Sequence, residues 1–214
     1  MPPPAQCTPA QQTDRRPVRL GPGNVLSSIF VAASEFKTPL TRPPMVHEVT
    51  IKDCRLTPSV VGAMRGDTLR ISSETDFPFM PQMGGSEYVE TLIKGQQRDH
   101  ALEALGVTTV LCAFTAPCGR ADVITVAHPI YALSDDAGHF RIEKVPANET
   151  FNVNAWHPLF RPTTQSVTVK PGETTRIELV LSPEPQYTPS SQAAMQRQQE
   201  EAAKQAPAPG SRPE

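Results

Sequence analysis

The sequence contains no apolar stretch of about 20 residues, the length that a transmembrane helix needs. Its first residues also lack the charged segment and apolar run of a secretory signal. Neither sign of charge predominates, because 20 Lys and Arg residues are balanced by 22 Asp and Glu residues, for a net charge of -2. A basic surface for nucleic acid or for an anionic membrane is therefore not expected. We expect no membrane span of its own and no nucleic-acid partner.

Motifs of the common enzyme classes are missing too. The sequence has no G-x-S-x-G nucleophile elbow and no phosphate-binding glycine loop. None of its five histidines belongs to an H-x-x-x-H or H-E-x-x-H pair. No C-x-x-C pair is present, so a structural zinc site is not expected either. These absences favour a protein that is not an enzyme.

Cysteine is scarce but even in number. The four cysteines are Cys7, Cys54, Cys112 and Cys118. Two disulfides would suit an oxidising compartment, and four cysteines allow three pairings. Four reduced thiols in a cytosolic protein would fit the same spacing, so the spacing alone leaves both readings open.

Proline is abundant, with 24 residues concentrated toward the two ends of the chain. Residues 1–17 are rich in Pro, Gln and Thr and predict an extended lead-in, and residues 183–214 predict a disordered tail. Between them, short β-type runs alternate with turn residues, a pattern typical of antiparallel sandwiches. The expected strands lie at 25–31, 46–51, 68–72, 108–112, 122–126, 139–142, 150–155, 165–169 and 174–181. Weak helical periodicity occurs only at 87–105 and 191–205.

Several segments match motifs of a known family. In the first half, Cys54-Arg55-Leu56-Thr57-Pro58 is similar to C-x-F-x-P-H-V, and Gly66-Asp67-Thr68-Leu69 follows it. Residues 74–80 align with N-x-D-x-x-x-H, and residues 111–118 with L-x-C-x-x-H-P-x-M. In the second half, residues 128–140 match H-P-x-x-x-x-T-D-x-x-G-x-F, and 145–146 and 155–157 match V-P and V-W-H elements. The order of these motifs resembles bacterial periplasmic proteins with a cupredoxin-like domain and a carboxypeptidase-regulatory-like (transthyretin-like) domain.

The resemblance implies an all-β fold with four regions. The lead-in (1–17) precedes a cupredoxin-like Greek-key β-sandwich (18–126). A small transthyretin-like, carboxypeptidase-regulatory-like β-sandwich (127–182) follows, and then the disordered tail (183–214). It also implies a periplasmic or extracellular location.

The family's copper ligands are degenerate in this chain. A blue-copper site needs a thiolate, two imidazoles and a weak axial thioether. The matching positions here are Met80 and Thr115 for the histidines, Cys112 for the thiolate and Cys118 for the methionine. Without imidazoles such a site cannot favour Cu(II), so we expect no cofactor. Because these family positions point at one metal ion, the resemblance implies a Cys112–Cys118 disulfide, which leaves Cys7 and Cys54 as the remaining pair.

The sequence therefore predicts a non-enzymatic protein that acts as a structural or accessory subunit of a larger periplasmic or membrane-associated complex. Aromatic and methionine side chains are favoured at interface cores. The expected contact residues are Phe77, Phe79, Met80, Met83, Trp156 and Phe160, although packing of their loops against their own domain is an equal alternative. One further alternative is a copper-binding or electron-transfer protein holding Cu(I) with Met80, Met83, Cys112 and Cys118. Another is a module that binds carbohydrate or a surface polymer.

Overall fold

The computed structural model describes residues 19–37, 39–84, 87–88, 91–112, 118–157 and 159–184. In these ranges the fold is all-β, as predicted, and the one helical element is a short 3-10 turn, η1 (Pro22–Asn24). A small antiparallel pair, β1 (Arg19–Leu20) and β2 (Leu26–Ser27), flanks that turn. Within the described part of the chain, no helix is long and apolar enough to cross a membrane.

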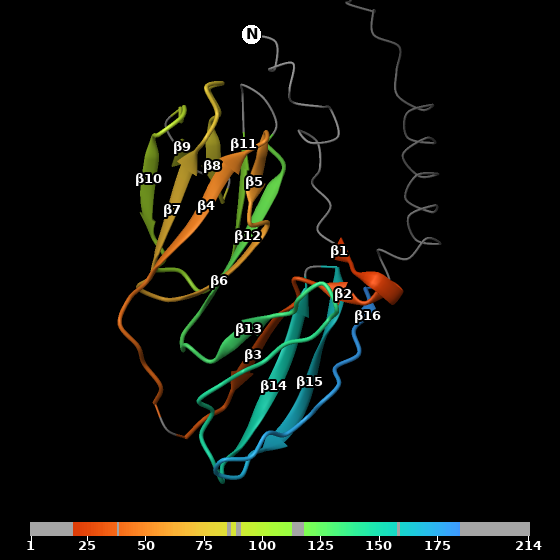
Figure 1. Ribbon diagram of the computed structural model, residues 1–214. Helices are drawn as coiled ribbons and strands as arrows, with labels where there is room; N and C mark the ends of the chain where they lie inside the picture. Colours follow the sequence, from red (N-terminus) through yellow and green to blue (C-terminus); the bar gives the residue numbers. More distant parts are fainter. Residues whose placement is uncertain are drawn as a thin grey trace, which may run out of the picture.

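The first sandwich consists of two sheets packed face to face (Figure 1). One sheet has the order β10 (Gln97–Ala101), β7 (Thr68–Ser73), β4 (Val46–Lys52), β5 (Arg55–Thr57). The other has the order β6 (Val60–Met64), β12 (Arg120–Val126), β11 (Gly106–Cys112), β8 (Pro81–Met83), β9 (Glu87–Tyr88). The pairs β4–β7 and β6–β12 are parallel, so the chain crosses between the sheets rather than forming only hairpins.

The core of the first sandwich follows from the alternation of side chains along its strands. In β7, Leu69 and Ile71 are buried while Thr68 and Arg70 are not, because successive residues of a strand point to opposite faces. Both sheets contribute to the resulting cluster, which includes Val49 and Ile51 from one and Val110 and Val123 from the other.

The second sandwich contains one five-stranded sheet in the order β13 (Tyr131–Leu133), β3 (Phe30–Ser34), β14 (Thr150–His157), β15 (Phe160–Thr168), β16 (Ser182–Pro183). The opposite layer is not a hydrogen-bonded sheet. The expected strands at 139–142 and 174–181 are not strands in the structure, although their apolar side chains pack against the sheet as a strand's would. The residues concerned are Phe140, Ile142, Ile177, Leu179 and Leu181. Apolar alternation correctly predicted burial there, but not the backbone ladder.

Strand β3 corrects one expectation about the organisation of the chain. The range 18–126, expected to form the first sandwich, includes Phe30–Ser34. This strand instead lies between β13 and β14, where Ala33 pairs with Val153 and Val31 with Ala132. Val31 and Ala33 are buried in the core of the second sandwich. A boundary at residue 126 remains a prediction, but the strand that precedes the first sandwich belongs to the second.

The weak helical periodicity over 87–105 is also corrected. That region contains β9 and β10, and the backbone of Leu92 pairs with that of Phe79. Gly95 has a φ of 80° and its N–H donates to the carbonyl of Ser73, so the chain turns there and cannot continue as a helix. The second helical candidate (191–205), the lead-in (1–17) and all of the expected tail except Pro183 and Glu184 lie outside the described residues.

Candidate functional site

A disulfide lies where the sequence motifs placed the metal loop. Cys112 ends β11 and Cys118 comes two residues before β12, and their Cα atoms are 5.2 Å apart across the bond. Both residues are buried, with exposed fractions of 5% and 0%. The predicted Cys112–Cys118 pair is therefore confirmed. Cys54 is also disulfide-bonded, and its expected partner Cys7 lies outside the described residues.

The residues at the family's ligand positions do not fit a copper centre. The sulfurs of Cys112 and Cys118 are bonded to each other, and a disulfide sulfur is not the thiolate that copper binds. Met80 stands at the position of the family's first histidine and offers a thioether instead of an imidazole. It directly precedes Pro81, which pairs with Cys112 across β8 and β11. Thr115 lies outside the described residues. Among the described residues, no group of three or more His, Cys, Asp or Glu side chains could hold a metal ion.

The structure divides the expected contact residues into two sets. Phe77 and Phe79 are not available to a partner: they are 9% and 0% exposed, and their rings meet edge-on at 5.2 Å in the core of the first sandwich. Met83 packs partly against the same core, as a gap-filling residue would. These three residues therefore pack against their own domain, which is the alternative that the sequence left open for this loop.

Met80, Trp156 and Phe160 are half-buried and remain accessible. Trp156 alternates with the buried Ala155 and His157 along β14, so it lies on the outward face of its sheet. The ring of Phe160 meets the ring of His157 edge-on at 5.1 Å. These residues lie on elements of both sandwiches and do not form one cluster in the described contacts.

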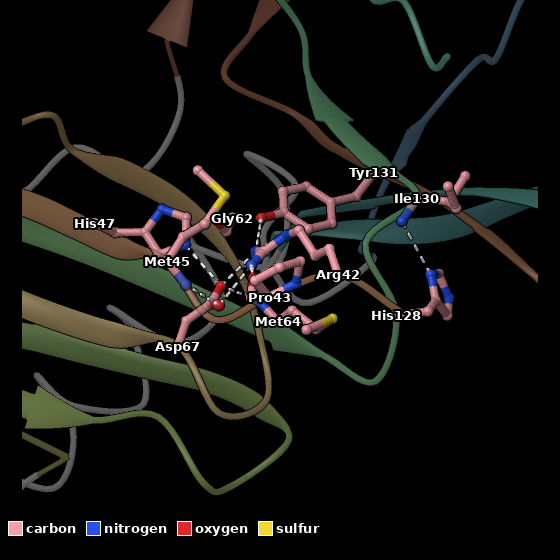
Figure 2. A network of polar contacts seen from close by, with 10 residues as sticks. All are labelled: Arg42, Pro43, Met45, His47, Gly62, Met64, Asp67, His128, Ile130 and Tyr131. Carbon is pink, nitrogen blue, oxygen red and sulfur yellow. Dashed lines mark hydrogen bonds and ion pairs between the residues drawn. The ribbon is translucent and has the colours of Figure 1, made fainter. Parts of the chain in front are cut away.

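A polar cluster that the sequence analysis did not single out lies where the two sandwiches meet, and it is centred on Asp67 (Figure 2). Asp67 is fully buried in the turn before β7. Its carboxylate accepts two hydrogen bonds from the guanidinium of Arg42, at 2.7 and 2.5 Å. It also accepts one from the Nε2 of His47 at 2.7 Å. The backbone N–H groups of Met45 and Met64 donate to it at 2.9 and 2.7 Å.

These contacts determine the charge of the Asp67 carboxyl. Burial on its own raises the pKa of a carboxyl group, since it disfavours the charged form. The hydrogen bonds from Arg42, Met64, His47 and Met45 outweigh burial, and they hold the pKa of Asp67 well below its usual range. The hydrogen bonds to Asp67 likewise raise the pKa of Arg42. The pair is therefore an ion pair at neutral pH, with a buried carboxylate and a guanidinium on the segment that joins β3 to β4.

Tyr131 brings the second sandwich to this cluster. Its hydroxyl donates to the carbonyl of Gly62 on β6 at 3.0 Å and accepts from Arg42 at 3.4 Å. Its ring stacks on Phe30 of β3 with centroids 5.4 Å apart. A Cβ at position 62 would lie 2.6 Å from the Tyr131 ring, so only glycine allows this approach without displacement. Gly62, Tyr131 and Phe30 thus form a close contact between the two sandwiches.

The contacts described for the cluster are those of a structural junction. An Asp–His pair can orient a general base when the imidazole also contacts a nucleophile. The described hydrogen bonds of His47 include no Ser, Thr or Cys partner, and the Asp67 oxygens are occupied by Arg42 and by backbone N–H groups. The arrangement joins the linker, the first sandwich and the second. In the sequence, the motif Gly66-Asp67-Thr68-Leu69 includes one member of the cluster, but it does not reveal the partner Arg42, 25 residues earlier.

Comparisons with known proteins give limited information. No protein-family model matches the sequence, and no curated protein matches it significantly. Among solved structures, a purple cupredoxin from Nitrosopumilus maritimus is 17% identical, with 37% of this chain and 98% of that chain covered and a TM-score of 0.34. A reduced amicyanin variant is 13% identical, with 45% and 98% covered and a TM-score of 0.36.

A copper-containing nitrite reductase from Thermus scotoductus is 12% identical, with 46% of this chain covered and a TM-score of 0.35. This chain spans 26% of that enzyme's length. These scores are low, and the fold described above rests on the strand order and register of the chain itself. The assignment of the second sandwich to a carboxypeptidase-regulatory-like family and the periplasmic setting remain predictions.

Proposed function

We propose that this chain is a non-enzymatic, extracytoplasmic β-sandwich protein that acts by contact, as a structural or accessory subunit of a larger assembly. The observation that carries the proposal is the buried Cys112–Cys118 disulfide. It uses both sulfurs that the motif could have offered to a metal ion, and disulfides persist mainly in oxidising compartments. A bonded pair of sulfurs closes the loop without metal, so the sandwich keeps its architecture and no electron-transfer centre is formed.

The junction supports this proposal by giving the chain a defined shape. Arg42, Asp67 and Tyr131 connect the linker and both sandwiches through charged and neutral hydrogen bonds. A subunit that holds neighbouring chains in position benefits from rigidity, because less conformational entropy is lost on assembly. Met80, Trp156 and Phe160 are the contact residues of the proposal, since Phe77 and Phe79 are enclosed in the core.

The proposal is tested with the protein extracted from its native membranes in a mild detergent. We expect the chain to elute in an assembly well above its own 23.3 kDa. Trp156→Ala and Phe160→Ala should shift it toward the free chain, because they remove aromatic anchors. Val107→Ala is the matched control, since Val107 is also apolar, is 42% exposed and is not a proposed contact.

Copper content separates this proposal from the copper alternative. After exposure to Cu(I) and Cu(II) without reductant, we expect metal analysis to find no stoichiometric copper, and mass analysis after alkylation to find no free thiol at Cys112 or Cys118. One bound copper per chain would overturn the proposal and favour an electron or copper carrier. A monomer in the native extract would overturn the assembly role.

A further inference from the structure

The second sandwich presents a polar surface on the outward side of its sheet. Along β14, Phe151, Val153 and Ala155 point inward and are buried, while Asn152 and Asn154 point outward. On β3, Ser34 shares the outward side with Ala32 and with the buried Phe30. We call this surface the polar face. Its residues are Ser34, Glu35, Asn152, Asn154, Thr164 and Ser166. All six are half-buried or exposed, so the surface is accessible in the described structure.

Two asparagines hold the polar face in a fixed arrangement. The amide of Asn154 donates to the hydroxyl of Ser34 at 2.7 Å and accepts from the hydroxyl of Thr164 at 2.8 Å. The amide of Asn152 donates to the carboxylate of Glu35 at 2.7 Å and accepts from the hydroxyl of Ser166 at 2.9 Å. Each amide therefore connects β14 to β15 on one side and to β3 or its last turn on the other. Two parallel rows of polar groups result.

Glu35 reaches this surface through an unusual backbone conformation. It directly follows β3 and has a φ of 64°, in the left-handed region that non-glycine residues seldom occupy. Such a conformation costs on the order of 1 kcal/mol and persists where the surrounding structure holds it. Here the contact with Asn152 accompanies it, and the carboxylate lies on the polar face instead of continuing the strand direction.

The rows retain unused hydrogen-bonding capacity on Asn152 and on the hydroxyls, whereas the amide nitrogen of Asn154 already donates to the hydroxyl of Ser34 and, at 3.5 Å, to the carbonyl of Ala32. An amide has two N–H donors and an oxygen with two lone pairs, and a hydroxyl that donates can still accept. The side chains are already held in place by one another, so a ligand would bind them without paying for their ordering. Trp156 lies two residues beyond Asn154 on the same outward face, about 7 Å along the strand. The surface thus combines fixed donors and acceptors with one aromatic side chain.

We propose that the polar face, with Trp156, binds an extended neutral oligosaccharide. Sugar hydroxyls both donate and accept, which suits amides and hydroxyls, and the apolar face of a sugar ring suits an aromatic side chain. Glu35 is the only ionisable group among the six residues, and a carboxylate accepts from hydroxyls but repels phosphate. This charge argues against nucleic acid. Trp156 is also a contact residue of the proposed function, so oligosaccharide binding is tested on the free chain through Asn152 and Ser166.

The first sandwich provides a comparison within the same chain. On the outward side of β4 and β7, Thr50, Ser72 and Glu48 also form a row, with contacts of 2.9 and 3.0 Å. That row contains no amide and no aromatic side chain. It represents an ordinary solvated surface of a sheet, and Ser72 is a matched control for Ser166 because both are strand serines with a hydroxyl in a polar row.

The experiment is calorimetric titration of the full chain with cellohexaose, maltohexaose and chitohexaose. We expect saturable binding of at least one of them with a Kd on the order of 1 mM, which a few net hydrogen bonds would give. Asn152→Ala should weaken it about tenfold or more, since it removes one amide and releases Glu35 and Ser166. Ser166→Ala should weaken it less, and Ser72→Ala should leave it unchanged. Circular dichroism confirms that each variant is folded.

The outcomes separate cleanly. Binding that falls with Asn152→Ala and Ser166→Ala but not with Ser72→Ala supports the proposal. No saturable binding by the unsubstituted chain overturns it, and so does binding that Asn152→Ala and Ser166→Ala leave unaffected. If Asn152→Ala does not fold, the comparison of Ser166→Ala with Ser72→Ala decides alone, because both side chains are on the surface and neither substitution opens a cavity.

Discussion

Replacing Asp67 with alanine should destabilise both sandwiches, although Asp67 belongs only to the first. The substitution removes a fully buried carboxylate and leaves the guanidinium of Arg42 without its partner. It also leaves the N–H groups of Met45 and Met64 without their acceptor. Breaking a buried ion pair by removing one member costs about 3–5 kcal/mol. With a urea m-value of about 2 kcal/mol/M, the unfolding midpoint should fall by roughly 2 M.

The single tryptophan makes this prediction specific. Trp156 lies in the second sandwich, so its fluorescence reports that unit, while circular dichroism reports both. If Arg42 and Tyr131 transmit the effect, both signals should shift together in Asp67→Ala. Asp99→Ala is the control, because Asp99 forms a similar bidentate pair with Arg70 but on an exposed surface, where such pairs contribute little.

The reasoning would be refuted by either of two results. One is a midpoint for Asp67→Ala no lower than that of Asp99→Ala. The other is a shift in circular dichroism with no shift in Trp156 fluorescence, which would show that the junction does not couple the two sandwiches.

Other consequences can be measured in the same assay. Gly62→Ala should lower the free energy of unfolding by about 1–3 kcal/mol, as overpacking does, because its Cβ would lie 2.6 Å from the Tyr131 ring. Adding Tyr131→Ala in the same chain should remove most of that clash. Additive effects of the two substitutions on stability would contradict this. Replacing Cys112 and Cys118 with alanine should lower the free energy of unfolding by about 2 kcal/mol, the loop-closure value for a ring of this size. An unchanged unfolding midpoint would show that the bond does not constrain the unfolded chain. The pKa of Asp67 is lower in the folded chain than in the unfolded chain. The ionised carboxylate therefore stabilises the fold fully above the unfolded pKa of about 3.9, and this contribution is lost as the pH falls further. Between pH 4 and pH 2.5 the midpoint of Asp67→Ala should therefore fall less than that of the unsubstituted chain, and parallel curves would exclude this assignment.

Strand positions could be predicted from the sequence wherever alternation and turns agreed. The expected strands at 46–51, 68–72 and 122–126 correspond to β4, β7 and β12, since each alternates or is buried between clear turn residues. Pairing could not be predicted in the same way. Nothing local to Phe30–Ser34 indicates that it pairs with residues 150–157, more than 100 positions later, because pairing depends on which strands bury a common face.

The candidate site shows the same division between local and long-range information. The resemblance implied the Cys112–Cys118 bond, because both cysteines stand at family positions that point at one metal ion. The preference of interfaces for aromatic side chains suggested Phe77 and Phe79 as contact residues, but both are buried in a core that they share with Leu92, whose backbone pairs with that of Phe79. The Asp67 cluster brings together residues from the linker, β4, the turn before β7 and β13, so no single stretch of sequence carries its signal.

The placement of β3 has a consequence for the synthesis and folding of the chain. The second sandwich is interrupted: its internal strand β3 is made first, and β13 to β16 follow only after roughly a hundred residues that include the first sandwich. During vectorial synthesis, the Phe30–Ser34 segment therefore has neither of its sheet partners until β13 and then β14 leave the ribosome. For the same reason, a fragment beginning at residue 127 would lack the strand that lies between β13 and β14.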